Sequence, residues 1–152
     1  MNDPLDALFQ VRHATASDSA AIVHLVQELA ASLGEQSLLT PDYAQLNLSF
    51  PDRGVLLAEQ DGAIIGLLSY SIRPDLYHAA PTALIEELVV SATARDQGVG
   101  SALLQAAEAH FREADCVEIS VSVMPDNPRA IQFYRIHGLT DEAIYLEKHL
   151  ED

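Results

Sequence analysis

Two glycines stand two positions apart in the segment Arg95–Ser101, where an apolar run ends and a helical pattern begins. Glycine has no Cβ, so the backbone at Gly98 and Gly100 can turn tightly and approach a ligand closely. The first N–H groups of a helix lack partners within it and lie at the positive end of its dipole, so they can hold a pyrophosphate. Close packing of the helix against a strand would explain the same glycines equally well, and both interpretations stay open on this segment alone.

Two other phosphate-binding motifs do not match this segment. The chain has no Gly-Lys-Ser or Gly-Lys-Thr sequence, which a Walker A loop requires. A dinucleotide fingerprint would place a third glycine at position 103, where the chain has Leu103. The local charge favours a phosphate ligand, because residues 95–135 hold four basic and six acidic side chains, whereas the rest holds four basic and 17 acidic ones. Uneven surface composition is the other explanation of that difference.

A second group of candidate residues follows at helical spacing. Asn127 and Tyr134 are about two helical turns apart, so both side chains project from one side of a helix. Taken alone, Asn127 is explained as an N-cap with Pro128 at the first helical position. Tyr134 alone is explained as a core aromatic residue beside Phe133. These residues are therefore candidates for a binding site only in combination with the glycine segment.

Hydrophobic periodicity predicts the elements that must position these residues. The expected strands are Phe9–His13, Val55–Glu59, Ala63–Ile72, Ala83–Val90, Val117–Val123 and Ala143–Leu150, and the expected helices run from Thr15 or Ser17 to Gly34, from Thr40 to about Leu48, from about Gly98 to Ala114 and from Asn127 to Gly138. Asp61-Gly62 predicts a hairpin turn, and Pro74-Asp75 is expected to end a strand. Strand 83–90, helix 98–114 and strand 117–123 form a βαβ unit, so two neighbouring strands should be parallel in an otherwise antiparallel sheet.

The composition is that of a folded protein. The chain has 152 residues, 49% of them hydrophobic, so we expect a single domain over residues 9–152 after a flexible start at residues 1–8. A formal net charge of −15 disfavours nucleic acids and anionic membrane surfaces as partners. Cys116 has no second cysteine to pair with, and the sequence shows neither a membrane-spanning run nor a signal peptide, so a cytoplasmic location is expected. The six histidines show no metal-ligand spacing, and we expect no metal.

Taken together, these residues resemble a known family. The strand Ile85-Glu86-Glu87-Leu88-Val89-Val90, the segment Arg95-x-x-Gly98-x-Gly100 and the spacing Asn127-x-x-Ala130-x-x-x-Tyr134-x-x-x-Gly138 are similar to those of the GCN5-related N-acetyltransferase (GNAT) family, over about residues 9–150. The resemblance implies an α/β fold, in which a mixed, mostly antiparallel sheet is flanked by helices. A parallel βαβ pair would splay apart to form an acetyl-CoA cleft.

The resemblance also implies how acetyl-CoA would bind as a co-substrate. Backbone groups of Leu88–Val90 would pair with the pantetheine arm like an added strand, and the backbone from Asp96 to Ser101 would hold the pyrophosphate. Asn127 would hydrogen-bond the pantetheine, and Tyr134 would lie near the sulfur. The implied cofactor-binding residues are Leu88, Val89, Val90, Arg95, Asp96, Gln97, Gly98, Val99, Gly100, Ser101, Asn127 and Tyr134.

Acetyl transfer to nitrogen needs a neutral amine, and because a free alkylamine has a pKa of about 10, a base or a water relay must take its proton. The family resemblance places a proton-relay carboxylate near Glu86 and Glu87. Adjacent strand residues face opposite ways, so only one should point into the cleft, and we favour Glu86. The N–H of Leu88 is the candidate oxyanion donor, and Tyr134 is the candidate general acid for the leaving thiolate. Direct attack in a ternary complex is therefore expected, without an acyl-enzyme at Cys116.

The expected acceptor is a primary amine of a small cationic molecule, because the acidic excess would concentrate cations at the cleft. The same charge also serves solubility. The resemblance implies a pocket lined by Leu33–Tyr43 and Thr140–Tyr145. The alternatives are a protein or peptide N-acetyltransferase, a non-catalytic acyl-CoA-binding sensor, and an interaction domain with an acidic face. Only residues 139–152 follow Gly138, so we expect a final hairpin that is either shortened or completed by a partner subunit in a homodimer.

Overall fold

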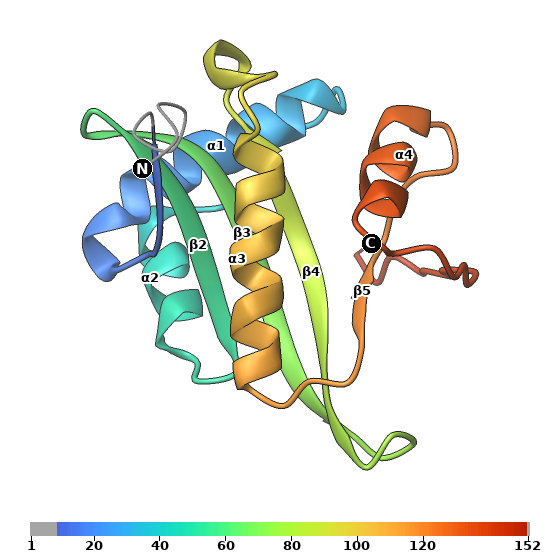
Figure 1. Ribbon diagram of the computed structural model, residues 1–152. Coiled ribbons are helices and arrows are strands. Elements are labelled where there is room, and N and C mark those ends of the chain that lie inside the picture. The colour runs from blue at the N-terminus through green and yellow to red at the C-terminus, as the bar shows by residue number, and fades with distance from the viewer. Residues whose placement is uncertain (1–8, 152) are drawn as a thin grey trace, which may run out of the picture.

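The computed structural model describes residues 9–151, which form a five-stranded sheet with helices on both faces (Figure 1). In chain order, the elements are β1 (Gln10–His13), α1 (Ser19–Ser32), α2 (Pro41–Ser49), β2 (Arg53–Gln60), β3 (Ala63–Asp75), β4 (Ala80–Val90), α3 (Val99–Glu113), β5 (Ile119–Val121) and α4 (Pro128–Ile136). The start that was expected to be flexible, residues 1–8, lies outside the described residues.

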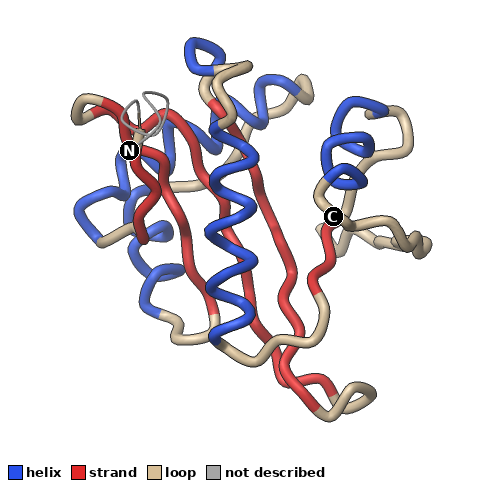
Figure 2. Tube along the Cα trace, in the orientation of Figure 1, coloured by secondary structure: helices blue, strands red, loops and turns tan. Residues whose placement is uncertain are grey.

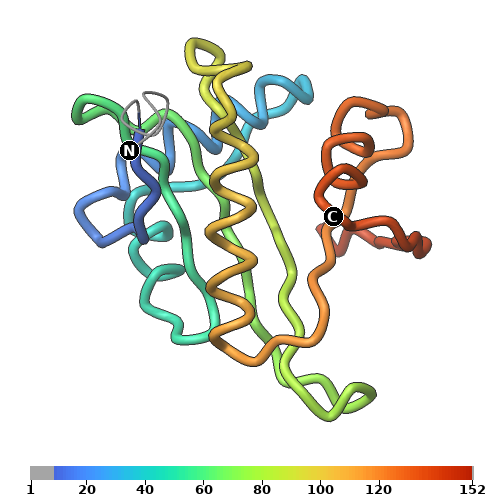
Figure 3. Tube along the Cα trace, viewed as in Figure 1, coloured from blue at the N-terminus to red at the C-terminus, as the bar shows by residue number. Residues whose placement is uncertain are grey.

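The strands follow one another across the sheet in the order β1-β2-β3-β4-β5. The first three pairings are antiparallel, and β4 pairs with β5 in parallel. Figure 3 follows the chain from β4 through α3 into β5, the crossover that parallel neighbours require. Asp61 and Gly62 both have positive φ, as a tight hairpin turn between β2 and β3 demands. The predicted fold class, including the βαβ unit, is confirmed.

Helices cover the sheet on two sides, with α3 on one face and α1 and α2 on the other (Figures 1 and 2). Leu25 of α1 and Ala44 of α2 pack with Leu57 and Leu67 of the sheet. On the opposite face, a larger core forms beneath α3 and α4. It contains Leu56, Leu68, Tyr70, Ile85, Val99, Leu103, Ala107, Phe111 and Tyr134. Strands β2, β3 and β4 contribute to both cores because their side chains alternate between the two faces.

Helix α3 lies close to β3 because Gly66 carries no side chain. A Cβ built on Gly66 would lie 2.8 Å from Cγ1 of Val99 and 3.1 Å from Cδ1 of Leu103, so any larger residue would push the start of α3 away from the sheet. At the other helices, Thr40 and Asn127 act as the expected N-caps of α2 and α4. None of the helices within residues 9–151 combines the length and the apolar character needed to cross a membrane.

Three sequence-based expectations about strands were wrong. Pro74-Asp75 does not end β3, which continues to Asp75 with Pro74 opposite Pro81. Proline is compatible with an extended backbone, and at the end of a hairpin its missing N–H costs little. The strand expected over 117–123 is shortened to Ile119–Val121, because β5 leaves β4 after three residue pairs. Residues 143–150 form no strand in the described chain, and their alternating apolar side chains, such as Ile144 and Leu146, are exposed. An alternating pattern gives a strand only where a neighbouring edge supplies hydrogen bonds.

Candidate active site

A β-bulge in β4 brings two carboxylates to the same face of the sheet. Ser69 of β3 lies opposite Glu87, but the next residue, Tyr70, lies opposite Ile85, so Glu86 is an extra residue in β4. Ile85 belongs to the core beneath α3, whereas Glu86 and Glu87 both line a cavity on the α1 and α2 side. The expectation that only one of the two glutamates would face the site was therefore wrong, because the bulge interrupts the alternation of side chains.

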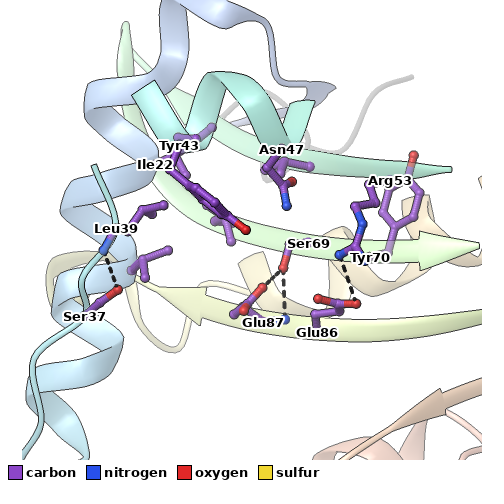
Figure 4. A pocket seen from close by; sticks show the side chains of 14 residues that line it. Ile22, Ser37, Leu39, Tyr43, Asn47, Arg53, Ser69, Tyr70, Glu86 and Glu87 are labelled. Carbon is purple, nitrogen blue, oxygen red and sulfur yellow. Dashed lines mark hydrogen bonds and ion pairs between the residues drawn. The ribbon is translucent and has the colours of Figure 1, made fainter. Parts of the chain in front are cut away.

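Two serines of β3 hold these carboxylates. The Ser69 hydroxyl donates to Glu87 and accepts from the Glu87 backbone N–H at 3.0 Å. The Ser71 hydroxyl donates to Oε1 of Glu86 at 2.9 Å, and the Arg53 guanidinium lies 3.6 Å from the same oxygen. Figure 4 shows the contacts of Ser69 and Arg53 with the two glutamates side by side.

The environment of Glu87 favours its neutral form. Burial raises the pKa of the Glu87 carboxyl, and the neighbouring Glu86 carboxylate raises it further, while the hydrogen bond from Ser69 and the charge of Arg53 lower it. A carboxyl group whose pKa lies above its usual range can exchange protons closer to neutral pH. Its raised pKa makes Glu87 a candidate proton acceptor on this face.

The cavity itself is small and polar on one side. It has a volume of about 180 Å³ and lies between the sheet and the helices α1 and α2 (Figure 4). The residues that line it are Ile22, Val26, Ser37, Leu39, Tyr43, Ala44, Asn47, Arg53, Val55, Leu67, Ser69, Tyr70, Glu86 and Glu87. The predicted contribution of Leu33–Tyr43 is therefore found in part, through Ser37, Leu39 and Tyr43. None of the described residues of Thr140–Tyr145 lines this cavity, contrary to expectation.

Beyond the bulge, the backbone of β4 has a free edge. Its pairing with β5 covers Ala83–Ile85 only. The N–H of Glu87 points to Ser69, and the N–H of Ser91 points to the Ile65 carbonyl at 2.8 Å, so both face β3. Because backbone groups alternate along a strand, those of Leu88 and Val90 face the side from which β5 has departed, whereas those of Val89 face β3.

The glycine segment lies beside this free edge. Gly98 is the N-cap of α3 and has a φ of +78°, a left-handed conformation that glycine adopts without strain. A Cβ on Gly100 would lie 3.5 Å from the Phe133 ring of α4 and 3.8 Å from Cγ2 of Val90. The start of α3 therefore lies between β4 and α4, and Asp96 before it forms an exposed ion pair with Arg129 at 3.2 Å. The turn interpretation applies to Gly98, whereas a Cβ on Gly100 would make ordinary contacts, so close packing does not require a glycine there.

Helix α4 carries the second group of predicted residues. Oδ1 of Asn127 accepts the Ala130 N–H at 3.1 Å as an N-cap, which leaves the side-chain NH₂ group available as a donor. Tyr134 is buried against Phe133, and burial raises the pKa of its phenol to about 12. Tyr134 belongs to the core beneath α3, so it lies on the opposite face of the sheet from Glu87. Glu86 and Glu87 directly follow the last residue of β4 that pairs with β5, and Tyr134 belongs to the core against which Leu88 and Val90 of the same strand pack.

Three residues of this site, Ser69, Ser71 and Arg53, were missed by the sequence reasoning. The signal for the two serines was present, since they alternate with Tyr70 in a strand that is otherwise largely apolar. Arg53 gave no signal, because it looks like an ordinary polar residue at the start of a strand. Its relation to Glu86 depends on the register between β2, β3 and β4.

The chain is similar in sequence to known acetyltransferases. The model of the acetyltransferase (GNAT) family matches residues 22–139. An aminoalkylphosphonate N-acetyltransferase of Salmonella typhimurium is 31% identical over 141 residues, which cover 93% of this chain and 91% of the relative. An aminoglycoside N(6')-acetyltransferase type 1 of Klebsiella aerogenes is 27% identical over 91% of this chain and 94% of its own length.

The fold is similar to that of solved structures as well. The crystal structure of an aminoglycoside acetyltransferase from an uncultured soil metagenomic sample, in complex with trehalose, matches with a TM-score of 0.84 at 21% identity, and the match covers 97% of this chain and 98% of that one. At this identity the likeness concerns the fold. The family model and the Salmonella relative each span most of the sequence, and they show that this chain belongs to the GNAT family of acetyltransferases.

Proposed function

We propose that the protein transfers the acetyl group of acetyl-CoA to a primary amine of a small molecule bound in the cavity between the sheet and α1 and α2. The observation that carries this proposal is the bulge in β4, which turns Glu86 and Glu87 into the same cavity. The acetyltransferase family supplies the reaction class. The acceptor and the roles of individual residues follow from the chemistry of this cavity.

The residues present fit acetyl-CoA, which supplies the acetyl group as an activated thioester. The free edge of Leu88 and Val90 offers N–H and C=O groups to the amides of an extended pantetheine arm, in the manner of an added strand. The first N–H groups of α3, capped by Gly98 without a side chain, suit a pyrophosphate. Asn127 keeps a donor free for the same ligand. These groups support the proposal that the chain binds acetyl-CoA at this edge.

In this proposal Glu87 accepts the proton that the bound ammonium must lose. A free alkylamine has a pKa of about 10, so it reaches the cavity charged at neutral pH. Glu86 attracts that charge, and Glu87, whose pKa is raised by burial, takes the proton directly or through one water molecule. The serines Ser69 and Ser71 orient the two carboxylates. The assignment of the base therefore moves from Glu86, favoured on the sequence alone, to Glu87.

Tyr134 is proposed as the proton donor to the leaving thiolate. Its pKa of about 12 keeps the phenol protonated at neutral pH, so the proton is available when negative charge develops nearby. The position of Tyr134 on the α3 side, with Glu87 on the α1 side, separates the donor from the acceptor of protons. This separation suits direct attack, with the two reactants arriving from opposite faces of the sheet.

The size and charge of the cavity favour a small cationic acceptor. The cavity has a volume of about 180 Å³. It can enclose an aminoalkyl group but not a whole aminoglycoside, of which only the reacting part would enter. Two carboxylates face one guanidinium among the lining residues, so the ionised cavity is net negative.

Arg53 favours a second class of acceptor, an amine that also carries an anionic group. Arg53 is the one basic residue among the lining residues, all of which lie in the described part of the chain. Its guanidinium meets Glu86 at 3.6 Å, a distance longer than a hydrogen bond, so its donors remain available to an oxyanion. The Salmonella relative is named for aminoalkylphosphonates, which contain both groups.

The test is a panel of acceptors assayed by thiol release from acetyl-CoA. The panel contains diamines, an aminoglycoside, an N-terminal peptide, and the matched pair 2-aminoethylphosphonate and 2-aminoethanol. We expect a small amine to give the highest kcat/KM, and Glu87→Gln to reduce it by at least about 100-fold, as loss of a general base does. Arg53→Gln should remove any preference for the phosphonate over the alcohol. Full activity of Glu87→Gln, or a preference for the peptide, would contradict the proposal.

A further inference from the structure

We propose that Tyr70 is a positioning residue, which sets the geometry of the two cavity carboxylates from the opposite face of the sheet. Tyr70 stands between Ser69 and Ser71 in β3, and these two serines donate to Glu87 and Glu86. The side chain of Tyr70 points to the other face, where it belongs to the core beneath α3. That this geometry matters for catalysis rests on the proposed function, whereas the positioning itself rests on the contacts of the Tyr70 side chain.

The hydroxyl of Tyr70 is held by two histidines from different elements. It lies 2.9 Å from Nε2 of His110, in the last turn of α3, and 3.3 Å from Nε2 of His13, in β1. The two histidine rings contact each other edge to face, with centroids 4.9 Å apart. A hydroxyl can donate to one ring nitrogen and accept from the other, so it links α3 and β1 through β3. Burial, followed by the charge of His110, lowers the pKa of His13, which keeps this ring neutral at neutral pH.

The ring of Tyr70 is fixed as well. Its register partner in β2 is Gly54, and a Cβ built there would lie 2.3 Å from the Tyr70 hydroxyl oxygen and 2.5 Å from Cζ. The ring therefore lies across the bare backbone of Gly54, and it packs edge to face on Phe111 of α3, with centroids 5.1 Å apart. Gly54, His13 and His110 stand in no sequence motif that indicates a role, and these contacts supply one.

The contacts that fix the Tyr70 side chain act on the bulge in β4. Tyr70 pairs with Ile85, the last residue before the extra residue Glu86. A bulge is a local break in the ladder of hydrogen bonds, so the strand opposite it must be held by other contacts if the bulge is to keep one geometry. A shift of Tyr70 would carry both neighbouring serines with it. The charged and titratable groups around Tyr70 and its two neighbouring serines are His13 and His110 on one face of the sheet, and Glu86, Glu87 and Arg53 on the other.

The test compares Ser69→Ala, Tyr70→Phe and the double variant, and it reads the titration of the Glu87 carboxyl. The hydrogen bond from Ser69 lowers the pKa of Glu87, so Ser69→Ala should move that titration upward by about half to one pH unit. Tyr70→Phe removes one oxygen atom, and it should give a part of the same upward shift. The double variant should shift by less than the sum of the two single shifts, because Tyr70 acts on Glu87 in part through the hydrogen bond that Ser69→Ala removes.

Two measurements record the titration of the Glu87 carboxyl. NMR of protein with ¹³C-labelled glutamate reports the carboxyl titration without any reference to activity, and the acidic limb of kcat/KM against pH reports it in turnover. Gly54→Ala displaces the Tyr70 ring without changing its atoms, and it should shift the titration in the same direction. Tyr77→Phe, at a tyrosine that is 91% exposed, is the matched control and should titrate as wild type.

The outcomes are distinct. A Tyr70→Phe titration equal to wild type, or a double variant that shifts by the sum of the single shifts, would overturn the positioning role even if stability were lowered. If Glu87→Gln kept full activity, the assignment of the base would fail, but the NMR titrations would still decide whether Tyr70 acts on Glu87.

Discussion

Gly100→Asp should weaken the binding of coenzyme A through charge alone. A Cβ at this position meets the Phe133 ring at 3.5 Å and the Val90 methyl at 3.8 Å, which are ordinary contact distances, so a short side chain fits beside α4. Aspartate in the first turn of a helix is favoured by the helix dipole, so the variant should fold. It also places a carboxylate at the N–H groups that are proposed to hold the pyrophosphate.

The size of the effect follows from Coulomb's law. Two unit charges about 5 Å apart at an effective dielectric constant of about 20 repel by about 3 kcal/mol, which corresponds to a roughly 150-fold weaker affinity. Gly100→Asn is the matched control, because it has nearly the same size and no charge. Calorimetric titration with coenzyme A at low and high salt measures both variants, and the difference between them should shrink as salt screens the repulsion. Equal dissociation constants for the Asp and Asn variants would refute a pyrophosphate at this helix terminus.

Three further changes test other parts of the site and the fold. Tyr134→Phe should lower kcat with little change in the affinity for acetyl-CoA, and an unchanged kcat would remove the proton donor role. Gly98→Ala should lower the free energy of unfolding in urea by about 1 kcal/mol, because the position has a φ of +78° and a free space around it, so that strain is the only cost. The ion pair with Arg12 lowers the pKa of Asp18 to about 2, so its stabilising effect is complete above pH 5 and is lost as the pH falls toward 2. Asp18→Asn should therefore lower the free energy of unfolding by about 1 kcal/mol at pH 6, a modest loss because water still reaches Arg12. The loss should be smaller at pH 3, and equal losses at both pH values would contradict this reasoning.

The order of elements around the site could be predicted from the sequence. The apolar run of β4, the alternation around β5 and the helical period of α3 are local patterns, and they define the βαβ unit without knowledge of the partner strands. The N-caps Thr40 and Asn127 and the turn at Asp61-Gly62 are equally local. The glycine segment was located for the same reason, because its residues are adjacent in the chain.

The geometry of the carboxylates could not be predicted in this way. A bulge is defined by the strand opposite it. The alternation of side chains predicts different faces for Glu86 and Glu87, but Ser69 pairs with Glu87 and Tyr70 pairs with Ile85, so Glu86 is left over and turns to the same face as Glu87. The failure at residues 143–150 has a related cause. Their pattern is that of a strand, but a strand also needs a pairing partner, and residues 143–150 pair with no described strand.

Residue-resolved amide hydrogen exchange, with and without saturating coenzyme A, tests the central claim most directly. The free edge of β4 is proposed to pair with the pantetheine arm, and the groups of Leu88 and Val90 face that edge while those of Val89 face β3. The account predicts that coenzyme A slows the exchange of the Leu88 and Val90 amides, together with those at the start of α3, and leaves Val89 nearly unchanged. Exchange at Leu88 and Val90 that stays the same in the saturated protein would contradict it.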